Sequence, residues 1–498
     1  MSEQPQTKTR KSLARRVGAW GLGLLIVLML AAGLFLNFAV GRDIAAPDWL
    51  RAKITEKINA DLGGVSMRFG DVAILVDSDW VPRLSLHDVV LRDATGVPLA
   101  SLSRAQSEVA FGPLLRGKVQ PAAVTLSGAR LTLRRSKTGE VGVTVGEARP
   151  TVQDAPNMAA LVGQMDAILE RPHFAALRQI EANNLTIRYE DARAGRAWSV
   201  DGGRVSMSRD GDDLTIRGDF AVLGARDYAT TLAMNYQGRV GHTAGDLGVT
   251  FEDMPARDIA GQTPALSWLA ALDAPISGSM RVSVNDDGAL SGLSATLDIG
   301  PGAVQPNEAT KPISFSRAQT YFTYDPAQQM LGFDEIAVDS PWVTARIEGR
   351  AYLVGAEQGW PEELLGQFRV SALSANPDDV YPEPVVLDSA VMDMRLRLQP
   401  FDVSLGQVAL LDQSERLVLS GSVSAAAEGW RVAIQGQRDG LGLERLLQLW
   451  PARGVAPKAR DWVVGNVRHA ALSDVQFALR LEPGQSKPEL FLGFDYDA

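Results

Sequence analysis

The chain has 498 residues, a net charge of −10 at pH 7 and 46% hydrophobic residues. This length predicts either several domains or one elongated, repetitive body. The acidic balance argues against a body that binds nucleic acid, and a sequence without cysteine excludes disulfides and thiolate metal sites.

The first 40 residues predict a membrane anchor. The stretch from Val17 to Val40 is 24 residues long, and Asn37 is its only strongly polar member. As a helix it would be about 36 Å long, enough to cross a hydrocarbon core of about 30 Å. Five basic residues precede this stretch: Lys8, Arg10, Lys11, Arg15 and Arg16.

The basic residues also predict the orientation of the anchor. Because positive residues favour the cytoplasmic side, residues 1–16 are predicted to be a cytoplasmic tail, residues 17–40 a single transmembrane helix, and the rest exported. A cleaved signal peptide is the alternative, although the apolar stretch is longer than a typical signal-peptide core.

A short amphipathic helix is expected next. Asp48 can cap it, and Gly63 and Gly64 are expected to end it. Its single apolar stripe has a residue at every fourth position: Leu50, Ile54, Ile58 and Leu62.

From Val65 onward the apolar period changes from 3.6 to 2, the period of a strand with one apolar and one polar face. Turn residues such as Asp210-Gly211 and Asp287-Gly288 separate about 25 candidate strands. A slip in phase at His87-Asp88 suggests a β-bulge. Regular alternation favours an antiparallel sheet with one solvated face. Nine apolar positions in these strands are Leu214, Ile216, Phe220, Val222, Leu232, Met234, Val282, Ala345 and Ile347.

Few helices interrupt the strands, and they suggest how the exported part is divided. Helices are expected at residues 158–169, 264–272, 441–449 and 458–467, the last two around Trp450-Pro451. The predicted regions are a helix plus strands (43–142), a polar linker with an amphipathic helix (143–180), a repetitive β-body (181–438), and a helical pair with further strands (439–498).

The sequence offers no catalytic or metal-binding pattern. The four histidines, at positions 87, 173, 242 and 469, are scattered, and no pair has metal-ligand spacing. Residues 112–118 have the spacing of a phosphate-binding loop, but Val119 stands where Ser or Thr would hold magnesium, and Pro121 blocks the helix that should follow. We therefore expect neither an enzyme nor a cofactor.

Three groups of motifs resemble the AsmA-like superfamily and, within it, the YhdP type of proteobacterial envelope protein. The first is the anchor followed by residues 54–63 and the strand at 65–69. The second is WVPRLSLHDV at 80–89, DATG at 93–96 and LSGARLTLR at 126–134. The third is LWP at 449–451, ARDWV at 459–463 and Asn466-Val467. Residues 200–430 share with the family only the general strand-and-turn pattern and none of these motifs.

The resemblance implies a bridge-like lipid transporter in the bacterial envelope. Its body would lie in the periplasm as an elongated sheet rolled into a groove, with the nine apolar positions lining the groove and no catalytic residue. The groove would shield phospholipid acyl chains between the inner and outer membranes and so support envelope integrity. The resemblance also implies that the chain is the N-terminal portion of a longer protein.

Two rival functions remain open at this point. A scaffold or assembly factor for outer-membrane proteins would have a closed, sandwich-like core. An exported hydrolase or glycan-binding enzyme would need a cleft with converging carboxylates or a metal pair. An apolar sheet face must be buried by a second layer or by lipid, and alternation alone does not distinguish the two.

Overall fold

The computed structural model describes residues 43–497 except 62–65, 77–81, 93–97, 115, 117–119, 138–139, 146–170, 193–194, 224–228, 357–360, 413–414, 454–455 and 486–487. The predicted cytoplasmic tail, the transmembrane helix and the helix at 158–169 lie outside the described residues, as does most of the predicted linker. No helix in the described part of the chain is long and apolar enough to cross a membrane.

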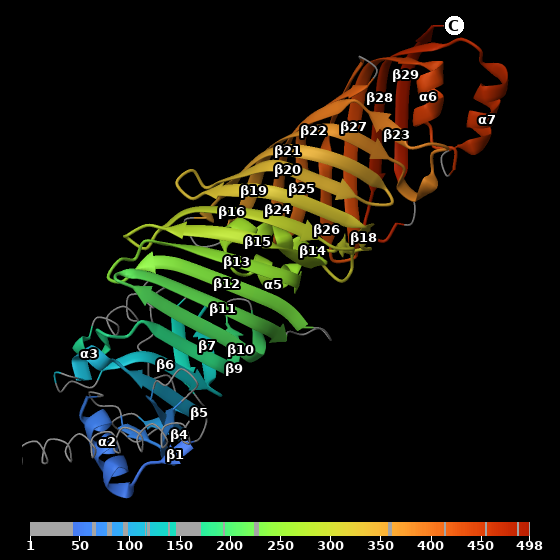
Figure 1. Cartoon of the computed structure of the whole chain (residues 1–498). Coiled ribbons are helices and arrows are strands. Elements are labelled where there is room, and N and C mark those ends of the chain that lie inside the picture. Colours follow the sequence, from blue (N-terminus) through green and yellow to red (C-terminus); the bar gives the residue numbers. More distant parts are fainter. Residues whose placement is uncertain are drawn as a thin grey trace, which may run out of the picture.

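The described chain is mainly β-structure, as the alternation predicts. One sheet contains 26 strands and a second contains three. Figure 1 shows the large sheet extending along the whole molecule, from β1 at one end to β29 at the other.

The N-terminal part comprises β1 (Asp43–Ala45), α2 (Asp48–Asp61), β2 (Ser66–Arg68), β3 (Val72–Val76), β4 (Pro82–Arg92), β5 (Pro98–Val109), α3 (Phe111–Leu114), β6 (Pro121–Ser127), β7 (Arg130–Arg135) and β8 (Val141–Val145). The expected first helix is confirmed as α2. Its Ile54 packs against a small apolar cluster built by the first strands, with Phe69, Val72, Leu86 and Val89.

The middle of the chain comprises η1 (Pro172–Phe174), β9 (Gln179–Asp191), β10 (Arg196–Asp210), β11 (Asp213–Leu223), β12 (Ala229–Arg239), β13 (Gly245–Pro255), α5 (Ala256–Ala260), η2 (Pro264–Ala271), β14 (Leu272–Asp273), β15 (Pro275–Val284), β16 (Leu290–Ile299), β17 (Gly302–Val304), β18 (Ile313–Phe315), β19 (Arg317–Asp325), β20 (Met330–Asp339) and β21 (Val343–Val354). The expected turns at 210–211 and 287–288 are confirmed between β10 and β11 and between β15 and β16.

The C-terminal part comprises β22 (Glu363–Ala375), η4 (Pro377–Asp379), β23 (Val385–Leu387), β24 (Ser389–Leu398), β25 (Phe401–Asp412), β26 (Glu415–Ala426), β27 (Gly429–Gly442), α6 (Leu443–Leu449), α7 (Pro457–Asn466), β28 (Ala471–Leu481) and β29 (Glu489–Asp497). The expected helical pair is confirmed as α6 and α7.

The strands follow one another in the large sheet in nearly chain order. From β9 to β13, and then through β15, β16, β19 to β22 and β24 to β29, each strand pairs with the next in antiparallel register. Strands β14, β17 and β18 form the separate small sheet.

The prediction of an entirely antiparallel sheet is wrong at one place. Both β6 and β7 pair with β9 in parallel register. They lie on the same edge of β9, on either side of a break at Gly128, whose φ is +69°. A parallel partner needs a long crossover connection, and β9 begins 34 residues after β8 ends. The sheet is therefore mixed.

The bulge predicted near His87 is not found there. In the register of β4 and β5, His87 faces Arg104 and Val89 faces Leu102, so both strands advance by two residues and Asp88 is not an extra residue; the register shifts instead between Leu91 and Arg92. At Asp88 the strand is irregular in another way, because its φ is +50°.

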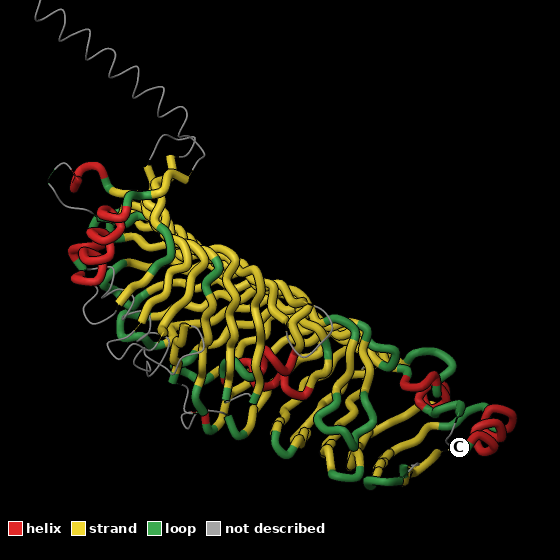
Figure 2. Tube along the Cα trace, turned by 90° about the horizontal axis from the view of Figure 1, so that it is seen from below, coloured by secondary structure: helices red, strands yellow, loops and turns green. Residues whose placement is uncertain are grey.

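A segment that we call the central insert (residues 256–273, with α5, η2 and β14) leaves the large sheet after β13 and packs back onto it. Figure 2 shows its helical part against one face of the strands. The insert and strands β13 to β22 share the largest hydrophobic cluster of the described chain.

A second long-range contact joins the loop between β17 and β18 to the turn between β26 and β27. The Nδ2 of Asn307 donates to the carbonyl oxygens of Ala425 and Ala426 at 3.5 Å and 3.4 Å. The Nε1 of Trp430 donates to the carbonyl oxygen of Lys311 at 2.7 Å. We call this contact the brace.

Candidate functional site

The candidate site is one face of the large sheet, and the strand register defines it. In β11 and β12, Phe220 faces Leu232, and Ile216 faces Tyr236. Because successive side chains of a strand alternate between faces, this register places all six candidates of these two strands on one face: Leu214, Ile216, Phe220, Val222, Leu232 and Met234.

The same face continues across the following strands. Met234 faces Val249, and Leu247 of the same strand faces Val282. The row of Val282 continues through Leu293, Tyr324 and Leu331 to Ala351 of β21, and alternation places Ile347 and Ala345 on the same face as Ala351. The remaining candidates, Val282, Ala345 and Ile347, therefore lie on the same face as the first six. We call this the apolar face.

The nine candidates differ in exposure. Leu214, Val222 and Ala345 are buried, at 4%, 9% and 6% exposed. The other six, Ile216, Phe220, Leu232, Met234, Val282 and Ile347, are partly buried. A partly buried apolar side chain still presents surface that another molecule can cover.

In the central part of the sheet, from β13 to β22, the chain covers its own apolar face. Leu266 and Leu269 of η2 are 1% and 0% exposed, and Ile259 of α5 is 1% exposed. Trp268 contacts Phe322 and Phe333 in edge-to-face geometry, with ring centroids 6.0 Å apart in both pairs. The insert therefore acts here as the second layer that an apolar sheet face needs.

Polar contacts fix the insert at the edge of the sheet. The buried carboxylate of Asp258 accepts hydrogen bonds from Arg196 and, at 2.9 Å, from the Nε1 of Trp198. Arg135 donates to the carbonyl oxygens of Gly261 and Gln262 at 3.5 Å and 3.4 Å. A buried carboxylate needs such partners, so these contacts determine where α5 lies.

In the C-terminal part, residues of β24 and β25 such as Ala390 and Leu410 are still buried in a cluster, but the rows of the apolar face that cross β26 to β28 have no such cover among the described residues. Val432 faces Val423 and Leu481, and Ile434 of the next row faces Leu479. These residues are partly exposed, and they belong to none of the hydrophobic clusters of the described chain. We call these rows of β26 to β28 the uncovered part.

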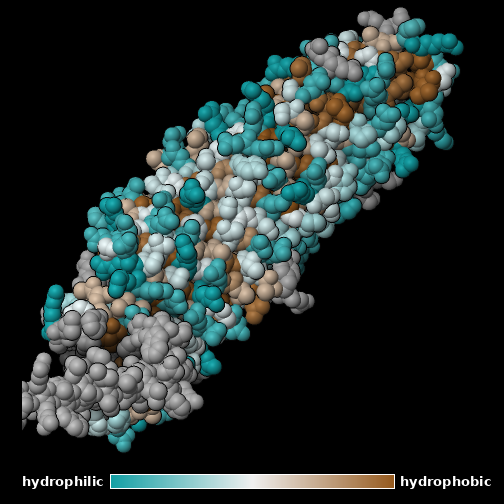
Figure 3. Space-filling model, in the orientation of Figure 1, coloured by the Kyte–Doolittle hydropathy of each residue, from teal (hydrophilic) through white to brown (hydrophobic). Residues whose placement is uncertain are grey.

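Hydrophobic surface also gathers at the far end of the sheet. On β29, Leu490 and Leu492 are 50% and 47% exposed, and Phe491 is 62% exposed. Figure 3 shows hydrophobic atoms concentrated at the end of the molecule that carries β28 and β29, whereas hydrophilic atoms prevail over the central strands in the same view.

A buried ionic group closes the rim of the uncovered part near α6. The Asp412 carboxylate, with a side chain 2% exposed, pairs with Arg438 at 2.5 Å and Arg445 at 2.6 Å. Burial alone would raise the pKa of Asp412, but the hydrogen bonds from Arg445 and Arg438 outweigh it and hold that pKa below its ordinary value. Arg445 also donates to the carbonyl oxygen of Val386 at 2.8 Å, so the group ties α6 to the sheet.

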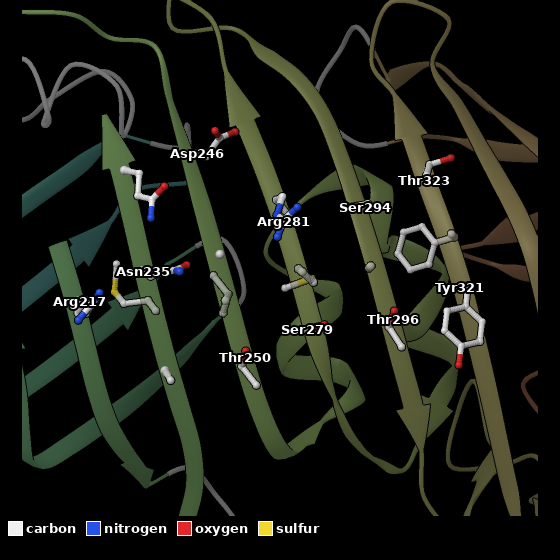
Figure 4. A pocket seen from close by; sticks show the side chains of 18 of the residues that line it. Arg217, Asn235, Asp246, Thr250, Ser279, Arg281, Ser294, Thr296, Tyr321 and Thr323 are labelled. Atoms are coloured by element: carbon white, nitrogen blue, oxygen red, sulfur yellow. The ribbon is translucent and has the colours of Figure 1, made fainter. Parts of the chain in front are cut away.

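The opposite face of the central strands is polar. A hollow of about 940 Å³ on this face is lined by charged, amide and hydroxyl residues of β11 to β20, and residues of the apolar face such as Met234, Val249 and Met280 also border it. Figure 4 shows Arg217, Asp246, Arg281 and Tyr321 on these strands. Ion pairs such as Arg317–Asp298, at 2.7 Å, cross neighbouring strands on this solvated side.

No group of three or more His, Asp or Glu side chains in the described ranges is arranged to hold a metal ion. His242 lies 3.5 Å from Asp286 at an exposed turn, and His87 lies in β4, far along the sheet.

Sequence reasoning missed two features of the site. It predicted a helical segment at 264–272 but not that this segment would cover the apolar face. It also missed the Asp412–Arg438–Arg445 group, whose members come from three separate elements. The alternation in β27 and β28 was visible, and it could have added Val432, Ile434, Leu479 and Leu481 to the candidates.

Comparison of the chain with protein-family models, with curated proteins and with solved structures found no match. The physical arrangement of the site must therefore carry the functional argument.

Proposed function

We propose that this protein holds phospholipid acyl chains on its apolar face. The observation that carries the proposal is the uncovered part, where rows of apolar side chains cross β26 to β28 without a covering layer among the described residues. Val423, Val432 and Leu481 form one such row, and all three are partly exposed.

The hydrophobic effect makes lipid a suitable occupant of this surface. Each buried methylene contributes about 0.8 kcal/mol, and an acyl chain has many of them. A row of apolar side chains offers similar contacts at each strand, so a chain can shift along the sheet without entering water. This role needs no catalytic residue and no cofactor.

The proposed architecture is a sheet rolled into an elongated groove with its apolar face inward. In this proposal the chain is an AsmA-like, YhdP-type envelope protein. Residues 17–40 anchor it in the bacterial inner membrane, the N-terminus is cytoplasmic, and the body is periplasmic. The groove shields phospholipid acyl chains between the inner and outer membranes and so supports envelope integrity. The motif resemblance and the basic residues before the apolar N-terminal stretch support this placement.

Site-specific photocrosslinking tests the proposal. A photoreactive amino acid at Ile434 is expected to capture phospholipid in cells, because this partly buried position lies on the apolar face. The matched control is position 433, whose alanine is exposed and points to the opposite face. Mass spectrometry of the adducts reads the result. Equal lipid capture at both positions, or none at 434, would contradict the proposal.

A second candidate function is a scaffold or assembly factor for outer-membrane proteins. One observation favours it: the central insert covers the apolar face as the core of a scaffold would be covered. This candidate predicts that the probe at position 434 captures a protein rather than a lipid, so the same experiment separates the two functions.

A further inference from the structure

A hollow of about 910 Å³ lies between the central insert and the strand ends that face it. Insert residues Arg257 and Ser267 line one side, and Glu362, Glu363 and Arg397 from the ends of β22 and β24 line the other. Arg196 also lines the hollow. It therefore lies beside the edge of the apolar face where the insert ends its cover.

Most charges around this hollow neutralise one another. Arg196 pairs with Asp258, and Arg397 pairs with Glu363 at 3.4 Å. Two opposite charges remain. Arg257 donates to the carbonyl oxygen of Gln305 at 3.3 Å but makes no ion pair within the described residues, and neither does Glu362. The hollow thus presents one available cation and one available anion.

One unpartnered hydroxyl lies in the wall of the hollow. Ser267 lines the hollow and is 5% exposed, and its Oγ is itself buried and has no hydrogen-bond partner among the residues that the structure describes. Buried hydroxyl groups usually have a partner, so the wall is polar but unsatisfied at this position.

The inner wall of the hollow is apolar and connects to the uncovered part. Ala260, Ala270 and Leu398 line it. Leu398 lies two residues after Leu396 in β24, so both side chains are on the apolar face. Leu396 faces Val403 of β25, which faces Val423 of β26. This row then continues to Val432 and Leu481.

We propose that this hollow binds the headgroup of a zwitterionic amino-phospholipid, one with a phosphate ester and a primary ammonium group. Arg257 binds the phosphate, Glu362 accepts hydrogen bonds from the ammonium, and the acyl chains lie along the row that begins at Leu396. This inference rests on the proposed function, because it assigns a headgroup to the same lipid.

The length of the row fits an acyl chain. Strands in a sheet lie about 4.8 Å apart, so the four steps from β24 to β28 span about 19 Å. One leaflet of a bilayer is half of a hydrocarbon core of about 30 Å, or about 15 Å. An acyl chain that begins at the hollow therefore remains on apolar side chains along its whole length.

The test measures headgroup preference with the purified full-length protein in detergent. Fluorescent phosphatidylethanolamine, phosphatidylglycerol and phosphatidylcholine serve as probes, and glycerophosphoethanolamine and inorganic phosphate serve as soluble competitors. We expect phosphatidylethanolamine to bind about three- to fivefold more tightly than the other two lipids, as an exposed ion pair allows. Competition by the soluble phosphates alone would identify a free phosphate ester as the ligand and overturn the lipid assignment.

Two variants assign the charges. Arg257→Gln is expected to weaken binding of phosphatidylethanolamine and phosphatidylglycerol by a similar factor. Glu362→Gln is expected to remove the preference for phosphatidylethanolamine and leave phosphatidylglycerol binding unchanged. Arg217→Gln and Glu335→Gln on the polar face are the matched controls, and circular dichroism checks that all four variants fold.

The outcomes separate this inference from the proposed function. Lipid binding without headgroup preference, unchanged in both variants, would overturn the headgroup site and leave the acyl-chain proposal standing. Failure of the protein to bind any of the three lipids would overturn both.

Discussion

The central part and the uncovered part of the sheet have the same alternation pattern, but only in the central part do other described residues of the chain cover the apolar face. In the central part, the chain fills the face with its own side chains, and Leu269 and Leu297 are both 0% exposed. In the uncovered part, equivalent positions such as Ile434 and Leu479 stay partly exposed. Strand patterning therefore identifies an apolar face, whereas a short insert decides whether the chain's own side chains cover that face.

The largest expected effect comes from a charge in the covered core. Leu266→Asp would bury an unpaired carboxylate beneath the insert, and we expect a loss of stability above about 4 kcal/mol. Urea unfolding followed by circular dichroism measures it. A variant that unfolds like the wild type would show that the insert does not pack on the sheet in solution.

The next largest effect is expected at the rim of the uncovered part. Asp412→Ala leaves Arg438 and Arg445 without their carboxylate, and removal of one partner of a buried ion pair costs about 3–5 kcal/mol. The free energy of unfolding at pH 7 measures this loss. Glu415→Ala, which changes an exposed acid near the same turn, is the control and should change stability by less than about 0.5 kcal/mol.

The same aspartate gives a pH dependence of known sign. The pKa of Asp412 is lower in the folded protein than in the unfolded chain. Its contribution to folding stability is therefore complete above the unfolded-state pKa of about 3.9 and is lost as the pH falls through the folded-state pKa. We expect urea midpoints of the wild type to drop below about pH 4 by more than those of Asp412→Asn. If the urea midpoints of the two proteins fall equally with pH, Asp412 is not the source of this pH dependence.

A smaller effect is expected near the end of the central part. Ala345 is 6% exposed and packs in a cluster with Val370 and Ala390, so Ala345→Asp should destabilise the fold by about 2–3 kcal/mol. The adjacent Thr344 is exposed on the polar face, and Thr344→Asp should stay within about 0.5 kcal/mol of the wild type. Thermal melting compares them, and reversed effects would show that the two residues point to the opposite faces.

The smallest effect on stability is expected at Ile434. An aspartate there keeps part of its hydration, so Ile434→Asp should lose only about 1 kcal/mol. The same change should remove bound lipid, which mass spectrometry of the purified protein measures. A variant that keeps its lipid would separate this position from the proposed binding surface, and one that unfolds would place it in a closed core.

Local features of the fold could be predicted because neighbouring residues encode them. Alternation placed Leu232 and Met234 in a strand, and the turn residues at 210–211 and 287–288 marked hairpins. The slip in phase at His87-Asp88 marked a backbone irregularity, the positive φ of Asp88, but not the bulge that we inferred from it. These predictions needed only the periods of strands and helices and the conformational preferences of turn residues.

The remaining features depend on contacts between distant parts of the chain. The helical pattern at 264–272 does not tell which surface Trp268 packs on. Asp412 and Arg438 are 26 residues apart, and no periodicity links them. The parallel pairing of β6 and β7 with β9 depends on where the chain returns after a long connection. The hollow beside the central insert combines strand ends and an insert whose proximity only the tertiary fold establishes.

The brace between Asn307 and the turn at β26 and β27 has a mechanical consequence. A sheet in which each strand contacts mainly its neighbours has a stability close to a sum of nearest-neighbour terms, and it can fray from its ends. The brace joins residues 118 and 119 positions apart, so the strands between them cannot peel away singly. They should therefore unfold cooperatively as one block. The terminal strands outside the brace should open independently of this block.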